Sequence, residues 1–159
     1  MNIKICCAGK LKEPYFEAAC GEFTKRLSRY CAVTIREVAD EKVPETLSPA
    51  CQAQALDKEG RRLLAALDEK DWVIALALGP DSPTSEQFAA RLAQLEDRGQ
   101  NQLAFVIGGS LGLAPMVLAR SRETLSLSSL TFPHRFARLI LLEQLYRSQK
   151  IRCGEPYHK

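Results

Sequence analysis

The chain has 159 residues, which is the length of one domain, and we expect a single domain over residues 1–159. Its hydrophobic fraction of 46% and charged fraction of 26% are ordinary for a globular protein and exclude a disordered or collagen-like chain. Uncharged apolar runs such as Val73–Leu78 and Leu139–Leu142 are far shorter than the ~20 residues of a membrane helix. The apolar stretch at the N-terminus is too short and too interrupted by lysine for a secretory signal. We therefore expect a cytoplasmic protein that makes no membrane contact.

The net charge of +3 is unevenly distributed along the chain. Residues 1–30 carry six Lys/Arg against three Asp/Glu, residues 31–119 carry eight against thirteen, and residues 120–159 carry eight against three. A basic surface built from the two ends would suit a polyanion such as nucleic acid. Because charged runs are often only solvated faces, charge alone leaves that function open.

The six cysteines and two histidines do not form a metal-ligand pattern. No Cys-x-x-Cys pair occurs, and neither His134 nor His158 has a ligand partner at helical spacing, so no metal site is expected. Because nothing indicates secretion, the cysteines are predicted to be reduced and to act mostly as small apolar residues.

The apolar pattern alternates between strand-length runs and helical spacing. It predicts strands over 2–8, 33–38, 72–78, 103–107 and 124–130. It predicts helices that begin at Pro14, Ser48–Pro49, Thr84 and Pro115, and a longest helix over Arg135–Lys150. Strands and helices thus alternate with short connections, which is typical of an α/β domain with a mostly parallel sheet between helices.

The predicted helix over Arg135–Lys150 is apolar on more than one side. A surface helix needs only one apolar stripe. The helix is therefore either deeply buried within the domain or part of a subunit interface.

Three loops follow predicted strands at positions where open parallel sheets bind ligands: 76–83, 108–113 and 127–134. Gly108–Gly109 either lets the backbone approach a ligand or makes a tight turn. The spacing is not Gly-x-Gly-x-x-Gly and follows the fourth predicted strand, which disfavours a Rossmann oxidoreductase. No P-loop motif is present.

Side chains suited to chemistry gather in the last thirty residues. Residues 131–135 are followed by Arg138, Glu143 and Arg147, and Glu143 and Arg147 share a helix face or form an ordinary ion pair. The tail ends in Tyr157, His158 and Lys159, which could stack on a base, move a proton and hold a phosphate. A frayed terminus is the alternative for these residues.

The chain closely resembles one family along its whole length. The motifs are Val106–Gly112, Leu125–His134, Glu143–Arg147 and Pro156–Lys159, with Gly9–Glu13, Asp40–Lys42 and Lys58–Gly60 earlier. They resemble the small SPOUT-class methyltransferases that methylate N3 of pseudouridine in bacterial large-subunit (23S) ribosomal RNA. Arg135, Phe136 and Ser148 depart from the residues common in that family, and these departures concern RNA contacts rather than the activity.

The resemblance implies an α/β fold with a deep trefoil knot, a homodimer and S-adenosylmethionine as methyl donor, with ribosomal RNA as substrate, naked or in the assembled ribosome. It implies that the cofactor site is formed by Leu76, Gly108, Leu127, Ser128, Ser129, Leu130, Thr131 and Phe132. We expect His158, helped by Tyr157, or else Glu143 to act as the general base. The residues expected to contact RNA are His134, Arg135, Arg138, Arg147 and Lys159.

Two other classes of function remain as alternatives. The chain could be a non-catalytic RNA-binding module on a nucleotide-binding-like fold, or a dehydrogenase. Binding of S-adenosylmethionine separates the methyltransferase from both, because an RNA-binding module need not bind it and a dehydrogenase would bind a nicotinamide cofactor.

Overall fold

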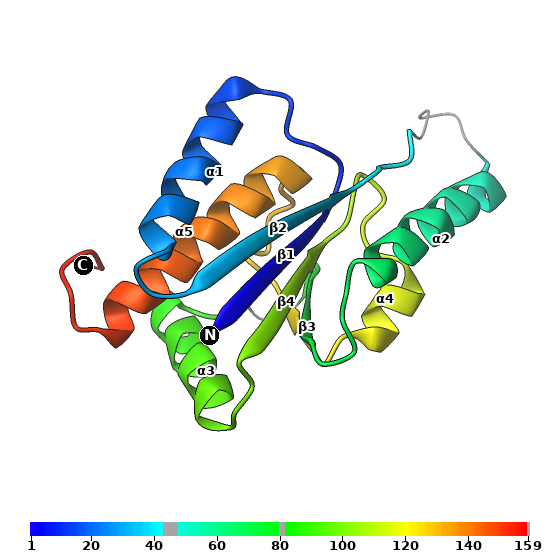
Figure 1. Ribbon diagram of the computed structural model, residues 1–159. Helices are drawn as coiled ribbons and strands as arrows, with labels where there is room; N and C mark the ends of the chain where they lie inside the picture. The colour runs from blue at the N-terminus through cyan, green and yellow to red at the C-terminus, as the bar shows by residue number, and fades with distance from the viewer. Residues whose placement is uncertain (43–47, 80–81, 159) are drawn as a thin grey trace.

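The computed structural model describes residues 1–42, 48–79 and 82–158, which form a three-layer α/β domain (Figure 1). A five-stranded parallel sheet with the order β2-β1-β4-β3-β5 lies in the middle. The strands are β1 (Asn2–Ala8), β2 (Ala32–Val38), β3 (Trp72–Leu76), β4 (Gln102–Ile107) and β5 (Glu123–Leu125). The helices are α1 (Pro14–Leu27), α2 (Pro49–Ala65), α3 (Ser85–Asp97), α4 (Pro115–Arg120) and α5 (His134–Arg152). The predicted element order and the parallel sheet between helices are confirmed.

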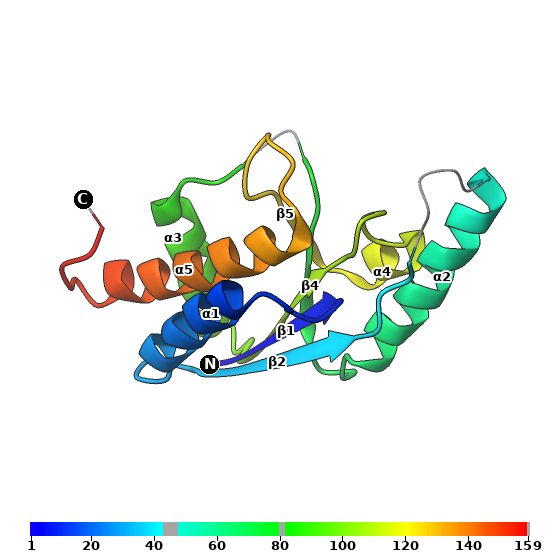
Figure 2. The same ribbon diagram turned by 90° about the horizontal axis from the view of Figure 1, so that it is seen from above.

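The helices divide between the two faces of the sheet (Figures 1 and 2). On one face Ile3, Ile5 and Phe105 pack against α1, α3 and α5, and on the other Cys6 and Val106 pack against α2 and α4. Successive residues of β1 and β4 therefore serve opposite layers, and this explains why their sequences are almost continuously apolar.

Helix starts follow the signals in the sequence. The Ser48 side chain accepts a hydrogen bond from the Cys51 N–H at the start of α2. Thr84 and Gln87 form the predicted capping box at the start of α3. Gly99, just beyond α3, has a φ of +76°, which is the left-handed conformation expected after a helix end.

The last strand is shorter than predicted. Only Glu123–Leu125 pairs with β3, whereas a strand was expected over 124–130. The Ser126 hydroxyl donates to the Ser128 carbonyl, and the Ser128 hydroxyl accepts from the Leu130 N–H. These local bonds compete with strand pairing and turn residues 126–130 into a loop.

The wide apolar surface of α5 is largely explained by burial. Leu141, Leu142 and Leu145 are fully buried in the core that α1, α3 and the sheet share with α5. Phe136 is 48% exposed, and its ring lies 4.8 Å from the Phe16 ring in an edge-on arrangement. The helix therefore extends the core and keeps apolar surface near its start.

The six cysteines are free thiols. Cys6, Cys7, Cys20 and Cys31 are buried, and burial raises the pKa of Cys6 to about 11 and that of Cys7 to about 12. Cys51 and Cys153 are exposed. Within the described ranges no helix combines the length and apolarity needed to cross a membrane, and no group of three or more His, Cys, Asp or Glu side chains is arranged to hold a metal ion.

Candidate active site

A cavity of about 730 Å³ lies at the carboxyl edge of the sheet, where the three predicted loops meet. Leu76 ends β3, Ile107 ends β4 and Leu125 ends β5, and all three contribute to its wall. The amino end of α5 closes one side through His134 and Ala137. Ligands of open parallel sheets bind in such a position, and the volume is typical of sites for small molecules.

Most of the residues expected to bind the cofactor line this cavity. They are Leu76, Gly108, Leu127, Ser128, Leu130, Thr131 and Phe132. Ser129 belongs to the same loop but is not among the lining residues. Leu78 and Leu130 are 62% and 66% exposed, so apolar surface is open to solvent at the cavity. Apolar walls with loop backbone between them can hold a flat heterocycle and hydrogen-bond its edge.

The glycine loop over 108–112 is shaped by the chain itself. A Cβ on Gly108 would lie 2.2 Å from the Gly112 carbonyl oxygen, and one on Gly109 would lie 2.8 Å from a Glu59 carboxylate oxygen. Gly112 closes the turn with a φ of +81°, and its N–H donates a hydrogen bond of 3.1 Å to the Gly109 carbonyl. The alternative left open by the sequence is thus resolved toward a tight turn, although Gly108 also lines the cavity.

Glu59 holds this loop and was not singled out as a functional residue from the sequence. Its carboxylate is buried and accepts the Gly109 N–H at 2.9 Å. Ala55 and Leu63 lie one turn before and after it on the buried face of α2. A carboxylate in the middle of an apolar helical face was the available signal, because a buried charge needs partners.

The chemically reactive residues of the tail gather on α5. The Tyr157 hydroxyl donates to Glu143 Oε1 at 3.0 Å, and Arg147 donates to the same oxygen at 2.6 Å through Nη2. The Arg147 guanidinium also lies over the Tyr157 ring, 4.7 Å from its centre. Burial and the bond to Glu143 raise the pKa of Tyr157. The described part of the tail is therefore docked on the protein rather than frayed.

His158 is held between two charged residues. Its Nδ1 lies 3.4 Å from Arg147 Nη1 and its Nε2 lies 2.7 Å from Glu86 Oε1. Hydrogen bonds from the backbone N–H of Glu86 and from His158 lower the pKa of Glu86 to about 2. Glu86 lies 72 residues from His158 in sequence, and no spacing rule could have connected them. Both ring nitrogens are engaged, so proton abstraction by His158 requires release of one contact.

The tail and the cavity lie at different parts of α5. None of Glu86, Glu143, Arg147, Tyr157 and His158 lines the cavity. In Figures 1 and 2 the C-terminus lies beside the far end of α5, whereas the cavity loops meet its start. The 19 residues of α5 span about 28 Å. Within one chain, the two halves of the predicted catalytic site are therefore separate.

The residues expected to contact RNA fall into different environments. Arg135 pairs with Glu13 near the start of α5 and is partly exposed. His134 lies beside Gly9 and Asp40, and burial together with the charges of Arg135 and Arg138 lowers its pKa, so the ring is neutral near pH 7. Lys159 lies outside the described residues.

Arg138 differs from its expected place on the surface. It is only 1% exposed, and it donates to Glu37 Oε1 at 2.6 Å and to the Gly9 carbonyl at 3.0 Å. Helical spacing placed it near Arg135 but could not show that its partners are Gly9, just after β1, and Glu37 of β2. In this position Arg138 holds the first loop of the chain against α5.

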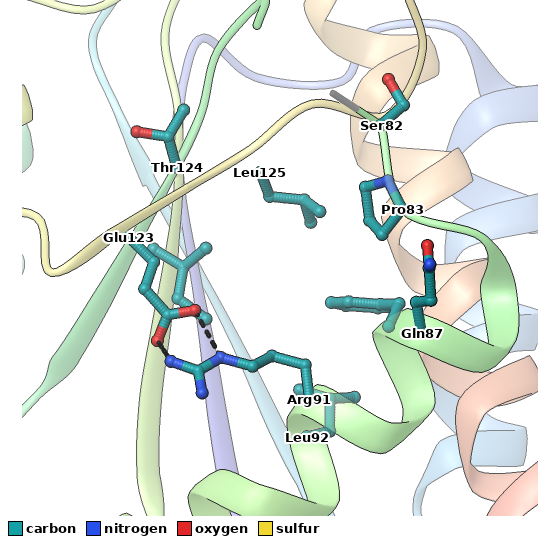
Figure 3. A pocket seen from close by; sticks show the side chains of 10 residues that line it. Ser82, Pro83, Gln87, Arg91, Leu92, Glu123, Thr124 and Leu125 are labelled. Atoms are coloured by element: carbon teal, nitrogen blue, oxygen red, sulfur yellow. Dashed lines mark hydrogen bonds and ion pairs between the residues drawn. The ribbon is translucent and has the colours of Figure 1, made fainter. Parts of the chain in front are cut away.

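A second cavity, of about 390 Å³, lies between α3 and β5 (Figure 3). Its polar wall is a pair in which Arg91 donates through Nε and Nη2 to the Glu123 carboxylate, at 2.8 and 2.6 Å. These charged groups satisfy each other, and none of the residues expected to act in catalysis or binding lines this cavity. The cavity at the carboxyl edge is therefore the candidate site.

The fold and this cavity define a class of protein, a parallel α/β domain with a cavity suited to a small ligand at the carboxyl edge of its sheet. A family model described as "Predicted SPOUT methyltransferase" matches residues 1–158. The chain belongs to the SPOUT methyltransferase family and is a methyltransferase.

Relatives match the chain over its full length. Proteins named ribosomal RNA large subunit methyltransferase H are 54% identical in Bifidobacterium animalis subsp. lactis, 50% in Lacticaseibacillus casei and 52% in Listeria monocytogenes, with all of each chain covered. A crystal structure described as that of a methylase family protein from Neisseria gonorrhoeae is 14% identical, with a TM-score of 0.53. The match covers 99% of this chain and 86% of that one, and at this identity it supports the fold alone.

Proposed function

We propose that this protein transfers a methyl group from S-adenosylmethionine to N3 of a pseudouridine in 23S ribosomal RNA. The observation that carries the proposal is the cavity at the carboxyl edge, which joins apolar walls to three loops within a methyltransferase fold. The names of relatives that match at 50–54% identity over the full length support ribosomal RNA of the large subunit as the substrate. A protein acting on ribosomes would work in the cytoplasm.

The residues of the cavity fit the proposed cofactor. Leu76, Leu127 and Phe132 offer apolar surface for an adenine ring, and the 126–132 loop offers backbone groups for its edge. When bound, S-adenosylmethionine supplies an electrophilic methyl group attached to a positively charged sulfur. No metal is required for such a transfer. The chain knot implied by the family resemblance also stays a prediction.

Methylation would form a bond between N3 and the methyl carbon while the bond from that carbon to the donor sulfur breaks and leaves a neutral thioether, and N3 must also lose its proton. A general base contributes about 10²–10⁴-fold to such a step. Glu143 is engaged by both Arg147 and Tyr157, so it is better suited to hold the tail than to take a proton. His158 can take the proton once it leaves Arg147 or Glu86, and Tyr157 can position the ring. Orientation of the uracil against the donor supplies further rate.

We infer that the active enzyme is a homodimer in which the tail of one subunit completes the cavity of the other. This inference follows from the separation of tail and cavity within one chain. Phe136, Ile140, Glu143 and Arg147 follow one another at spacings of three or four residues and form an outward stripe on α5, which we call the outer stripe. A two-fold axis across this stripe would place helix starts beside helix ends. Tail and cavity would then meet across the interface.

The remaining cations suit the RNA substrate. Arg135 and Arg147 on α5, together with Lys159, would contact phosphates or the ring. The assembled ribosome is the proposed form of the substrate.

The test is methyl transfer to defined substrates. Ribosomes lacking the modification, naked 23S RNA and RNA with uridine in place of the target pseudouridine are incubated with the protein and S-adenosylmethionine carrying a labelled methyl group. We expect label at one N3 position, fastest on ribosomes and absent from the uridine substrate. Absence of transfer to every substrate, with RNA still bound and S-adenosylmethionine not bound, would favour the non-catalytic RNA-binding alternative.

A further inference from the structure

A third concave surface lies next to the candidate active site, between α1 and the edge strand β2. It is an open groove of about 980 Å³, and its rim carries Lys10, Lys25 and Arg36. β2 is at the edge of the sheet, because it pairs only with β1. We call this surface the α1–β2 groove, and the mechanism described above does not use it.

The groove carries positively charged side chains that are free to contact a ligand. Lys10, Lys25 and Arg36 are exposed, and in the described ranges none of their side chains forms an ion pair or a hydrogen bond with another residue. By contrast, Lys4, Arg62, Arg91, Arg147 and Arg152 are paired with carboxylates. Three cations without a counter-ion on one concave surface attract a polyanion.

Buried Arg138 strengthens this positive balance. It lines the groove and neutralises Glu37, one of the two carboxylates there, through a bond of 2.6 Å. Glu17 is the other. The groove therefore has four cationic groups against two anionic ones, and one of the anionic groups already has its partner within the protein.

Gly9 is buried between the groove and the candidate active site. The Gly9 carbonyl accepts from Arg138 on the groove side, and a Cβ on Gly9 would lie 3.3 Å from Nε2 of His134, which lines the cavity. Lys10 follows directly in the chain. A strand that leaves the cavity past His134 thus meets Lys10 first and can continue along α1, whose 14 residues span about 21 Å.

We propose that the α1–β2 groove binds the sugar–phosphate backbone of the RNA strand that flanks the target nucleotide. Exposed, unpaired cations contact phosphates without reading sequence, and such contacts position a strand and set its affinity. The inference rests on the proposed function, because the strand is the ribosomal RNA whose base enters the cavity. It also accounts for the basic N-terminal segment, which the tail and the cavity leave without a role.

The test replaces the three cations together. In the groove variant, Lys10→Gln, Lys25→Gln and Arg36→Gln are combined. The control variant combines Lys58→Gln, Lys70→Gln and Arg98→Gln. It also removes two lysines and one arginine, but from exposed positions outside the groove. Affinity for a fluorescein-labelled single-stranded RNA and for unmodified ribosomes is measured over a range of salt concentrations, together with calorimetry of S-adenosylmethionine binding and steady-state methylation.

We expect the groove variant to bind RNA at least about tenfold more weakly, with a log–log salt slope reduced by about 2, since each single-strand phosphate contact contributes about 0.7. KM for ribosomes should rise, while kcat and cofactor affinity stay unchanged. The control variant should behave as the wild type. RNA should also protect Lys10 and Lys25 of the wild-type protein from acetylation, as read by mass spectrometry.

Three results would overturn the proposal. The groove variant could match the wild type in affinity and slope, or the control variant could lose as much affinity as the groove variant. The groove variant could also bind free RNA normally but ribosomes weakly, which would indicate a protein partner at the β2 edge. Failure of the proposed function is a separate outcome, in which the wild type itself transfers no methyl group to ribosomal RNA.

Discussion

The Tyr157 hydroxyl donates a 3.0 Å hydrogen bond to Glu143, which joins the C-terminal tail to the middle of α5. Two further contacts fix the start of the tail, since Tyr30 donates to Glu155 at 2.7 Å and Lys150 pairs with the same carboxylate. Residues 155–158 are thus arranged before any substrate binds, and preorganisation of this kind reduces the ordering cost of binding.

Removal of residues 156–159 tests the catalytic role of the tail. We expect the fold, the dimer and cofactor binding to survive, because little core is lost and the cavity loops lie elsewhere, while single-turnover methylation falls by orders of magnitude. His158→Ala alone should cost about 10²-fold or more if the imidazole is the base. Tyr157→Phe, which removes only the hydroxyl bonded to Glu143, is the matched control and should cost much less.

The outcomes of these variants are separable. If His158→Ala keeps a near-normal rate while truncation abolishes it, the tail positions the substrate and Glu143 becomes the next candidate base. An unchanged rate after truncation would show that the catalytic site has been assigned to the wrong residues.

The outer stripe of α5 makes a prediction about assembly. Phe136→Glu places a charge on a side chain that is 48% exposed, so we expect a folded monomer instead of a dimer in sedimentation analysis at micromolar concentration. Leu142→Glu is unsuitable for this purpose, because Leu142 is fully buried in the chain's own core and the variant should unfold. A wild-type protein that sediments as a monomer at that concentration would contradict the dimer.

Glu59 gives a prediction about the cofactor loop. Glu59→Ala removes the acceptor of the Gly109 N–H, so we expect a stability loss of about 1–3 kcal/mol and weaker S-adenosylmethionine binding. Glu59→Gln keeps one acceptor oxygen and should lose less. Urea unfolding and calorimetry check both effects, with Glu69→Gln on the exposed surface as the control. Unaltered cofactor affinity in Glu59→Ala would show that the loop needs no such support.

The environment of His134 predicts a dependence of stability on pH. Because burial and two nearby arginines lower its pKa in the folded state, the unfolded chain binds this proton more readily. His134 should therefore not change the free energy of unfolding above the unfolded pKa of about 6.5. It should lower the free energy of unfolding as the pH falls below that value. His134→Gln should narrow the difference in unfolding free energy between about pH 7.5 and pH 5.5. Equal differences for the variant and the wild type would refute the assignment.

The sequence predicted the order of elements because each strand is a short apolar run and most helix starts carry a clear cap or proline. It predicted the cavity because three loops after parallel strands must meet at one edge of a sheet. It overestimated β5, where serine hydroxyls compete for the backbone. It also could not place Arg138, whose partners Gly9 and Glu37 lie 129 and 101 residues away. Contacts of that range depend on strand order, which no local pattern specifies.

The distribution of buried and exposed thiols allows the tail to be labelled selectively. The four buried cysteines should resist alkylation, since none of them faces solvent and burial raises the pKa of Cys6 to about 11 and that of Cys7 to about 12. A maleimide dye should therefore reach only Cys51 and Cys153. With Cys51→Ser, Cys153 remains as the single exposed cysteine, and it follows α5 directly, four positions before Tyr157. A fluorophore there would report movement of the tail during turnover without introducing any new cysteine.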